Sequence, residues 1–305
     1  EKKDAAAALS EPVKPITFWL DNTIPLKYRD AVTRGVLEWN NAFEKIGFKN
    51  ALAVKVQPDN ADFDTLDVNT ASIRWMTNPD PAFGAIGPSH ADPRSGEILD
   101  ADIGIESLSS RAIRTVRSQV LSGRAAFDWP ALLQARDADA PGSEQRPGEA
   151  MHGRHGDEVC QYADMAAEQL GYALEVLDTR GDLDPAGPEA QQWVTDYLVD
   201  VSMHEVGHTL GLRHNFRSSR IYTDKQLSDR AFTATNGLAG SVMEYQPINL
   251  PRPGEPGGAP FQTVLGPYDY WAVEYAYKPI AAADEAAELQ RIAGRSGEPL
   301  LAYGT

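Results

Sequence analysis

The sequence predicts an α+β fold, in which a sheet of about five strands packs on a long N-terminal helix and on a second helix that carries histidines. Two periodicities support this. One set of apolar residues recurs at helical spacing, and several short segments alternate apolar and polar residues as half-buried strands do. The helical set comprises Tyr28, Val32, Val36, Trp39, Phe43 and Ile46. With 305 residues, of which 42% are hydrophobic, the chain can bury a large core.

The elements are expected in a simple order along the chain. A strand at residues 16–20 precedes a helix that Pro25 opens, because the fixed φ of proline suits the first helical position. Further strands are expected at residues 52–56 and near residues 73–75. Segments 83–90 and 97–105 then read as a hairpin around the turn at residues 92–96. A closing helix is expected at residues 267–277.

Residues 204–214 read H-E-x-x-H-x-x-G-x-x-H and indicate metal chemistry. His204 and His208 lie four apart, so on a helix both imidazoles can reach one ion. Gly211 can take a left-handed conformation and end the helix, after which His214 returns as a third ligand. Three protein ligands leave the fourth zinc position open for water, as in catalytic sites. Glu205 is then expected to be a general base and not a ligand. The alternative is an amphipathic helix with three satisfied histidines.

This motif resembles that of the metzincin clan of zinc peptidases. The clan places a methionine turn beneath the zinc, and Ser241-Val242-Met243-Glu244-Tyr245 stands where that turn is expected. The resemblance implies that Met243 forms a packed floor without touching the metal. A tyrosine two residues after the methionine approaches the zinc in the astacin and serralysin branches. Tyr245 is therefore expected to be an extra ligand or an oxyanion stabiliser, with a plain buried tyrosine as the alternative. Asn215, after the third histidine, matches neither the matrixin nor the astacin pattern.

Within the clan, the chain is most similar to the bacterial Met-zincin domains of large exported proteins, over residues 15–280. The phrase at residues 92–102, DPRSGEILDAD, also resembles that family. The resemblance implies a metzincin-like fold with a twisted mixed sheet. An N-terminal subdomain would cover residues 1–214, with a helical insertion at about 106–190. A smaller, largely helical and irregular C-terminal subdomain would cover residues 215–305. The insertion would hold helices near residues 107–122 and 157–177.

The clan binds substrate backbone along an edge strand above the active site. The stretch Gly84, Ala85, Ile86 and Gly87 is expected to be that strand, because its small residues let another backbone approach. The alternative is simply a glycine-rich strand end.

The composition of the chain limits the kinds of partner that it can bind. A net charge of −16 excludes a nucleic-acid ligand, whose phosphates need Lys and Arg. No apolar run is long enough to span a membrane. The chain begins at Glu1, so we expect a processed protein or an excised piece. The protein is expected to be exported, that is periplasmic, outer-surface or extracellular, with flanking domains.

One catalytic Zn²⁺ is expected. The acidic charge leaves a structural Ca²⁺ open, although no EF-hand spacing is present.

Two further features have competing interpretations. Cys160 is the single cysteine, which rules out an intrachain disulfide. Its surroundings do not resemble the inhibitory pro-segment cysteine of some metzincins, so we expect a buried free thiol. His152 and His155 form an H-x-x-H pair, which is either a second metal site or part of a solvated loop.

Two functional hypotheses follow. The first is a zinc endopeptidase that cleaves peptide or protein substrates through a zinc-activated water, with Glu205 as general base and Tyr245 assisting. The alternative is a non-catalytic zinc-containing binding or assembly module of a larger exported protein. A non-proteolytic zinc hydrolase is a weaker rival, because no other nucleophile or phosphate-binding loop lies near the motif.

Overall fold

The computed structural model describes residues 1–78, 84–106 and 160–305 and confirms the α+β class. Its sheet has six strands in the order β2-β1-β3-β6-β4, and β5 also pairs with β6. Strands β1, β2, β3 and β6 run parallel, whereas β4 and β5 are antiparallel to β6. The expected mixed sheet is therefore confirmed. The strands are β1 Ile16–Leu20, β2 Leu52–Val56, β3 Ser72–Met76, β4 Ala85–Ile86, β5 Ser89–Ala91 and β6 Ile98–Glu106.

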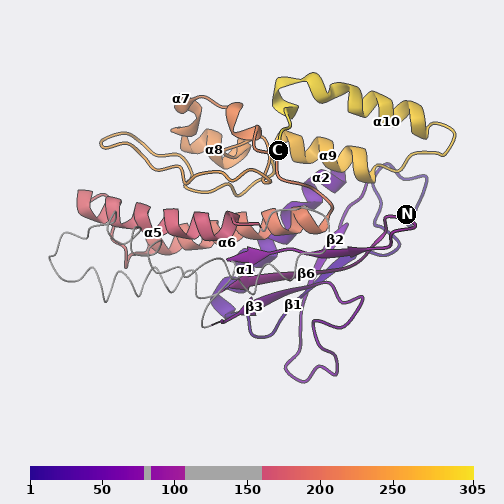
Figure 1. Ribbon diagram of the computed structural model, residues 1–305, viewed down its shortest axis with the longest axis horizontal. Helices are drawn as coiled ribbons and strands as arrows, with labels where there is room; N and C mark the ends of the chain where they lie inside the picture. The colour runs from indigo at the N-terminus through magenta and orange to yellow at the C-terminus, as the bar shows by residue number, and fades with distance from the viewer. Residues whose placement is uncertain (79–83, 107–159) are drawn as a thin grey trace, which may run out of the picture.

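Helices α1 and α6 lie against one face of this sheet, and the C-terminal helices lie beyond them, as Figure 1 shows. Helix α5 runs beside α6. The N-terminal half of the described helices comprises α1 Leu26–Glu38, α2 Asn40–Lys45, α5 Tyr162–Arg180 and α6 Pro188–Thr209. The C-terminal helices are α7 Asp224–Leu227, α8 Arg230–Asn236, α9 Pro267–Tyr277 and α10 Glu285–Ala293. Short 3-10 turns are η3 Ser218–Arg220, η4 Gly294–Gly297 and η5 Pro299–Leu301.

The start of the first helix and its continuity differ from the expectation. Pro25 is the residue before the helix, with an extended backbone (φ −56°, ψ 134°), and the helix begins at Leu26. The apolar stripe up to Ile46 is shared by two helices that meet at Trp39. The fully buried indole of Trp39 donates to the carbonyl of Met203, 3.1 Å away, and Asn40 is hydrogen-bonded to the backbone of Leu52. Periodicity could not reveal this break, because the chain keeps its direction through it.

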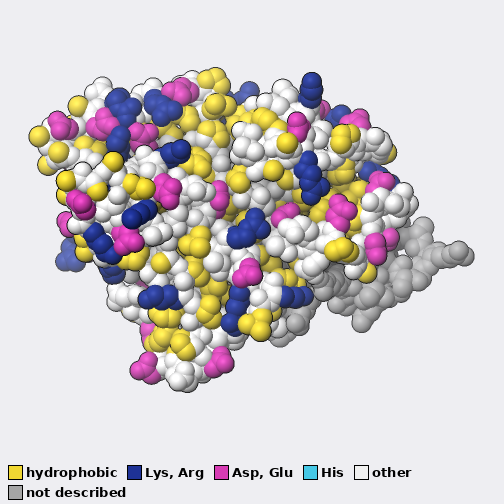
Figure 2. Space-filling view, turned by 180° about the vertical axis from the view of Figure 1, so that it is seen from behind, with side chains coloured by type: hydrophobic (Ala, Val, Ile, Leu, Met, Phe, Trp, Pro, Cys, Tyr) yellow, Lys and Arg dark blue, Asp and Glu magenta, His cyan; other side chains and the backbone are white. Residues whose placement is uncertain are grey.

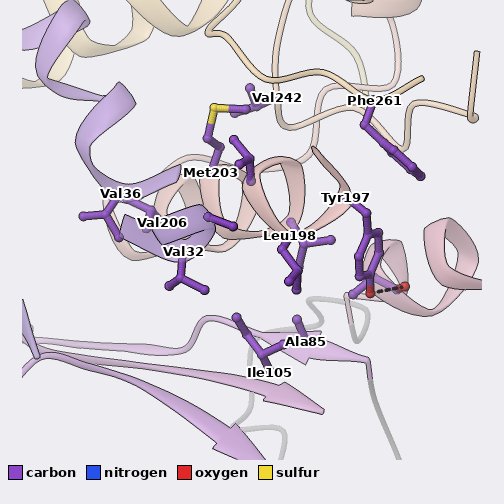
Figure 3. Packing of buried hydrophobic residues seen from close by; sticks show 14 of the residues in the cluster. Val32, Val36, Ala85, Ile105, Tyr197, Leu198, Met203, Val206, Val242 and Phe261 are labelled. Atoms are coloured by element: carbon purple, nitrogen blue, oxygen red, sulfur yellow. Dashed lines mark hydrogen bonds between the residues drawn. The ribbon is translucent and has the colours of Figure 1, made fainter. Parts of the chain in front are cut away.

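Helix α6 is buried on several sides, which is why its histidines are held rigidly. Figure 3 shows Val32 and Val36 of α1 on one side of it, Ile105 and Ala85 of the sheet below, and Val242 and Phe261 above. Each fully buried aliphatic side chain of this kind contributes about 1.5–3 kcal/mol relative to exposure. Almost every residue from Tyr197 to Gly207 is buried. The helix therefore forms the centre of the core, and the metal motif sits at its C-terminal end.

Several expectations fall outside the described residues, namely the helix at 107–122, the His152 and His155 pair, and the start of the hairpin at Phe83. The helix expected near residues 157–177 is α5. On the face shown in Figure 2, basic side chains are interspersed with acidic ones. None of the described helices combines the length and the apolar character that a membrane span requires.

Candidate metal centre

The end of helix α6 brings the motif together as the sequence predicts. Gly211 has a left-handed backbone, with φ of +88°. Its amide donates to the carbonyl of His208 at 2.9 Å, and the amide of Leu212 donates to that of Gly207 at 3.0 Å. These two bonds form a Schellman motif, which satisfies the last carbonyls of the helix and reverses the chain. The reversal returns His214 to the face that carries His204 and His208.

Backbone carbonyls orient two of the imidazoles. Nδ1 of His204 lies 2.7 Å from the carbonyl oxygen of Val242, and Nδ1 of His208 lies 3.1 Å from that of Leu212. A carbonyl only accepts, so Nδ1 carries the proton in each ring and Nε2 keeps its lone pair for a metal. Nε2 of His208 and Nε2 of His214 are 3.0 Å apart. Burial, followed by the neighbouring histidines, holds the pKa of His204 well below its usual value, which keeps it in the neutral form that binds metal.

A fourth donor joins the three histidines. The sulfur of Cys160 lies 3.5 Å from Nε2 of His204. The ligand atoms of Cys160, His204, His208 and His214 all lie within 4.8 Å of one another. A tetrahedral zinc with ordinary bond lengths would separate S and N by about 3.6 Å and two N atoms by about 3.3 Å. The side chains therefore fit zinc with little movement, and among the described residues no other group of three or more such side chains was found. This His/Cys group does not support the structural Ca²⁺ that the acidic charge of the chain left open.

The segment Ser241, Val242 and Met243, which we call the floor, lies beneath this cluster. Met243 is fully buried. Its sulfur packs so closely on Gly207 of α6 that a Cβ at residue 207 would clash with it. Glycine between the first two histidines of the helix thus lets the methionine come up against the helix backbone.

Asp269 fixes the floor from the start of helix α9. Its carboxylate accepts from the hydroxyl of Ser241 at 2.6 Å, from the amide of Val242 at 3.0 Å and from the amide of Gly266 at 2.8 Å. Because the carbonyl of Val242 orients His204, Asp269 is a positioning residue for that ligand. In the sequence, Asp269 stands out only as an acidic residue in the first turn of α9. Its place in the first turn can be predicted from the neighbouring residues, whereas its contact with the floor depends on tertiary packing.

Glu205 is fully buried beside the cluster. Its Oε1 lies 3.7 Å from the sulfur of Cys160, and its Oε2 has no hydrogen-bond partner in the described part of the chain. Burial raises the pKa of Glu205 to about 8. A Cβ added at Gly87 would lie 2.7 Å from the backbone oxygen of Glu205. The expected edge segment therefore ends against the residue expected to be the base.

The other residues of the expected edge segment belong to β4 and its N-terminal side. Ala85 and Ile86 pair with Ile105 and Gly104 of β6. The amide of Gly84 donates to the carboxylate of Asp164 on helix α5, at 2.8 Å. This short strand is thus tied both to the sheet and to α5.

Residues 160–162, which we call the cover, close the cluster from the side of helix α5. The ring of Tyr162 stacks on that of His204, with centroids 4.6 Å apart, and its hydroxyl donates to Asp200 at 2.7 Å. The hydroxyl of Tyr245 accepts from the amide of Gln161 at 2.8 Å and donates to the sulfur of Cys160 at 3.6 Å. Tyr245 also meets the His214 ring edge-on, with centroids 4.7 Å apart. The structure therefore brings Tyr245 to the histidines and directs its hydroxyl at the cover.

Cys160 is the site residue that sequence reasoning missed. It is a buried free thiol, as expected, but it lies at the histidines and not in an inert part of the core. Forty-four residues separate it from His204, so no ligand spacing could reveal it. The available signal was weak: a solitary buried cysteine in a chain that also carries a three-histidine motif.

Comparison with known families agrees with this geometry. Residues 186–305 match the Met-zincin family model. The resemblance to Met-zincin is thus confirmed from residue 186 onward, over the motif, the floor and helix α9. Comparison with curated proteins and with solved structures found no match. The Met-zincin match and the His/Cys cluster together mark a zinc metallopeptidase-like domain.

Proposed function

We propose that the chain is a zinc-dependent endopeptidase in which Glu205 is the general base. The observation that carries this proposal is the buried carboxylate of Glu205. Its Oε1 faces the metal cluster, and its Oε2 has no hydrogen-bond partner among the described residues. A buried polar group without a partner costs about 1–3 kcal/mol. A purely structural zinc site gains nothing from such a group, whereas a hydrolase needs a base within reach of its attacking water.

The residues have distinct roles in this proposal. His204, His208 and His214 would hold zinc, which as a Lewis acid polarises a carbonyl and lowers the pKa of water to about 7. Glu205 takes the proton of the attacking water and passes it to the leaving amine. Burial raises the pKa of Glu205 to about 8 in the metal-free chain, and the charge of a bound Zn²⁺ would lower it toward the range of a general base. The hydroxyl of Tyr245 donates a hydrogen bond to the oxyanion.

The proposed substrate is a peptide segment that lies along β4. This strand ends the sheet order and pairs with β6 on one side. An extended peptide can add to such an edge through backbone hydrogen bonds. Gly87 lies against the backbone of Glu205, so the C-terminal end of this strand is close to the proposed base. We further propose an exported location and flanking domains, on the Met-zincin resemblance alone.

A non-catalytic zinc module remains the second candidate. Four protein ligands are typical of structural zinc sites, and Cys160 supplies a fourth donor here. The two candidates differ in what they say of Glu205: the module has no use for its carboxylate.

The deciding experiment measures hydrolysis of casein and of a peptide library by the zinc-loaded chain, with and without a chelator. Glu205→Gln keeps the size of the side chain and removes the base. It should lower turnover by about 10²–10⁴-fold while zinc content stays near one per chain. Glu189→Gln makes the same change at the exposed start of α6 and should leave turnover unchanged. A Glu205→Gln variant as active as the parent chain would reject the proposed base.

A further inference from the structure

We propose that Cys160 is a fourth zinc ligand that closes the resting site and must leave before substrate is cleaved. This inference rests on the proposed zinc peptidase function and adds a regulation of the same site. It assigns a role to a residue that the mechanism above does not use.

The position of the sulfur carries the first step of the argument. Sγ of Cys160 is 3.5 Å from Nε2 of His204 and 3.7 Å from Oε1 of Glu205. It therefore lies between the first metal ligand and the base. That is where the attacking water must lie if Glu205 is to take its proton. Thiolate and water compete for one position, so the site holds one or the other.

Without a metal the thiol stays neutral, because burial, followed by the charge of Glu205, raises the pKa of Cys160. A cation bound beside the sulfur would offset that effect, and two features of the site help it. Cys160 directly precedes Gln161, the N-cap of the 19-residue helix α5, and the positive end of a helix dipole favours a thiolate. The amide of Tyr162 and the hydroxyl of Tyr245 both donate to the sulfur. When zinc binds, the S–H bond breaks, a Zn–S bond forms and the proton leaves to solvent. No electrons are transferred, and no further reactant is needed.

Within the cover, Cys160 is held differently from the histidines, which makes it able to leave. His204 and His208 are anchored to backbone carbonyls within the core. Cys160 is held through the hydroxyl of the half-buried Tyr245 and through Gln161, which is exposed. Withdrawal of Cys160 breaks contacts of the cover and leaves the histidine anchors in place. Glu205, whose Oε2 has no partner, is then beside an open metal position.

Cobalt substitution tests the ligand without reference to activity. The full chain loaded with Co²⁺ should show the d–d bands of a tetrahedral site together with a near-ultraviolet thiolate-to-cobalt charge-transfer band. Cys160 is the single cysteine, so any such band reports on it alone. In Cys160→Ser, which is nearly isosteric, the d–d bands should persist and the charge-transfer band should vanish. Zinc should also protect the parent thiol from a disulfide reagent such as Ellman's reagent.

Peptide hydrolysis then tests the closing role. Cys160→Ser and Cys160→Ala should both cleave a peptide faster than the parent chain, by about tenfold or more, and should bind zinc about tenfold or more weakly in competition with a chromophoric chelator. Circular dichroism checks that the variants fold. The parent spectrum and its thiol protection need no variant, so a failure of either variant to fold leaves the proposal open to refutation.

The outcomes separate this proposal from the function on which it rests. Cobalt d–d bands without a thiolate band, in a chain that cleaves peptide, would overturn the role of Cys160 and leave the peptidase intact. A thiolate band in a chain whose Cys160→Ala variant cleaves nothing would establish the ligand, overturn the closing role and favour the non-catalytic module. A parent chain that binds neither Zn²⁺ nor Co²⁺ would overturn both.

Discussion

The floor and the cover of the metal cluster are built from different kinds of contact. The floor is fully buried and is held by two hydrogen bonds to one carboxylate, that of Asp269. In the cover, Tyr162 stacks on His204 and donates to Asp200, whereas Cys160 is held through contacts of its sulfur at 3.5–3.7 Å. Sulfur contacts of this kind are weaker than the charge-assisted bonds of a carboxylate. Asp269 therefore fixes the floor, and with it His204, more firmly than the sulfur contacts fix Cys160.

Tyr245 links the two regions, because it follows the floor in sequence while its hydroxyl contacts the cover. Two roles for this hydroxyl can be separated. It can stabilise the oxyanion, or it can only secure Cys160. The expected effects differ once the cysteine is removed.

The largest effect is expected for Tyr245→Phe in a Cys160→Ala background. If the hydroxyl serves the oxyanion, kcat on a peptide should fall by about 10–10³-fold, the scale of one lost donor, with zinc retained. Tyr222→Phe is a matched control, since its hydroxyl donates to the carbonyl of Asn236 at 3.0 Å, away from the metal cluster, and it should leave kcat unchanged. An unchanged kcat in the double variant would assign Tyr245 to the cover alone.

Among changes that affect the floor, Asp269→Ala should lower the free energy of unfolding the most. It leaves three donors without their acceptor, and we expect a loss of about 3 kcal/mol in the free energy of unfolding. Urea denaturation of the zinc-loaded chain measures it. Glu285→Ala removes an exposed first-turn acid from helix α10 and should cost at most about 1 kcal/mol. Equal losses in the two variants would show that the carboxylate does no more than suit a helix dipole.

Asp200 supports the cover from below through its bond to Tyr162, and it should give a pH-dependent effect. Burial raises the pKa of Asp200 to about 7 from its ordinary 3.8. The folded state therefore binds more protons than the unfolded state between these values. The stability from this group is fully present below pH 3.8 and is lost as the pH rises through about 7.

Urea denaturation of the metal-free chain and of Asp200→Asn at several pH values measures this effect. The stability of the parent relative to the variant should fall by up to about 1.4 kcal/mol for each pH unit across that window. Parallel curves for the two proteins would mean that Asp200 is ionised throughout.

The smallest effect is expected for Met243→Leu, which nearly conserves volume. We expect a loss of less than about 1.5 kcal/mol and a modest loss of activity. Gly207→Ala tests the same contact from the other side and should be worse, because the added methyl group clashes with the methionine sulfur. Thermal unfolding of the two variants ranks them, and the reverse order would show that the methionine can move aside.

Local patterns were sufficient wherever the deciding contacts are close in sequence. The i, i+4 spacing of His204 and His208 and the left-handed Gly211 follow from helix geometry, which the sequence states directly. The alternating strands follow from periodicity, and the proline at position 267 marks the start of helix α9. The break at Trp39 was missed because this residue keeps a helical backbone and the apolar stripe continues through it.

What only the tertiary structure decided is the environment of the metal cluster. Asp269 reaches Ser241 across 28 residues, Tyr162 reaches Asp200 across 38, and Cys160 reaches His204 across 44. Such contacts leave no spacing in the sequence, because loops of any length can close them at a cost in entropy that rises only slowly with length. The sequence by itself therefore determined the three histidines, the adjacent glutamate and the methionine turn. The packing of helix α5 on α6 brings Cys160 next to the histidines.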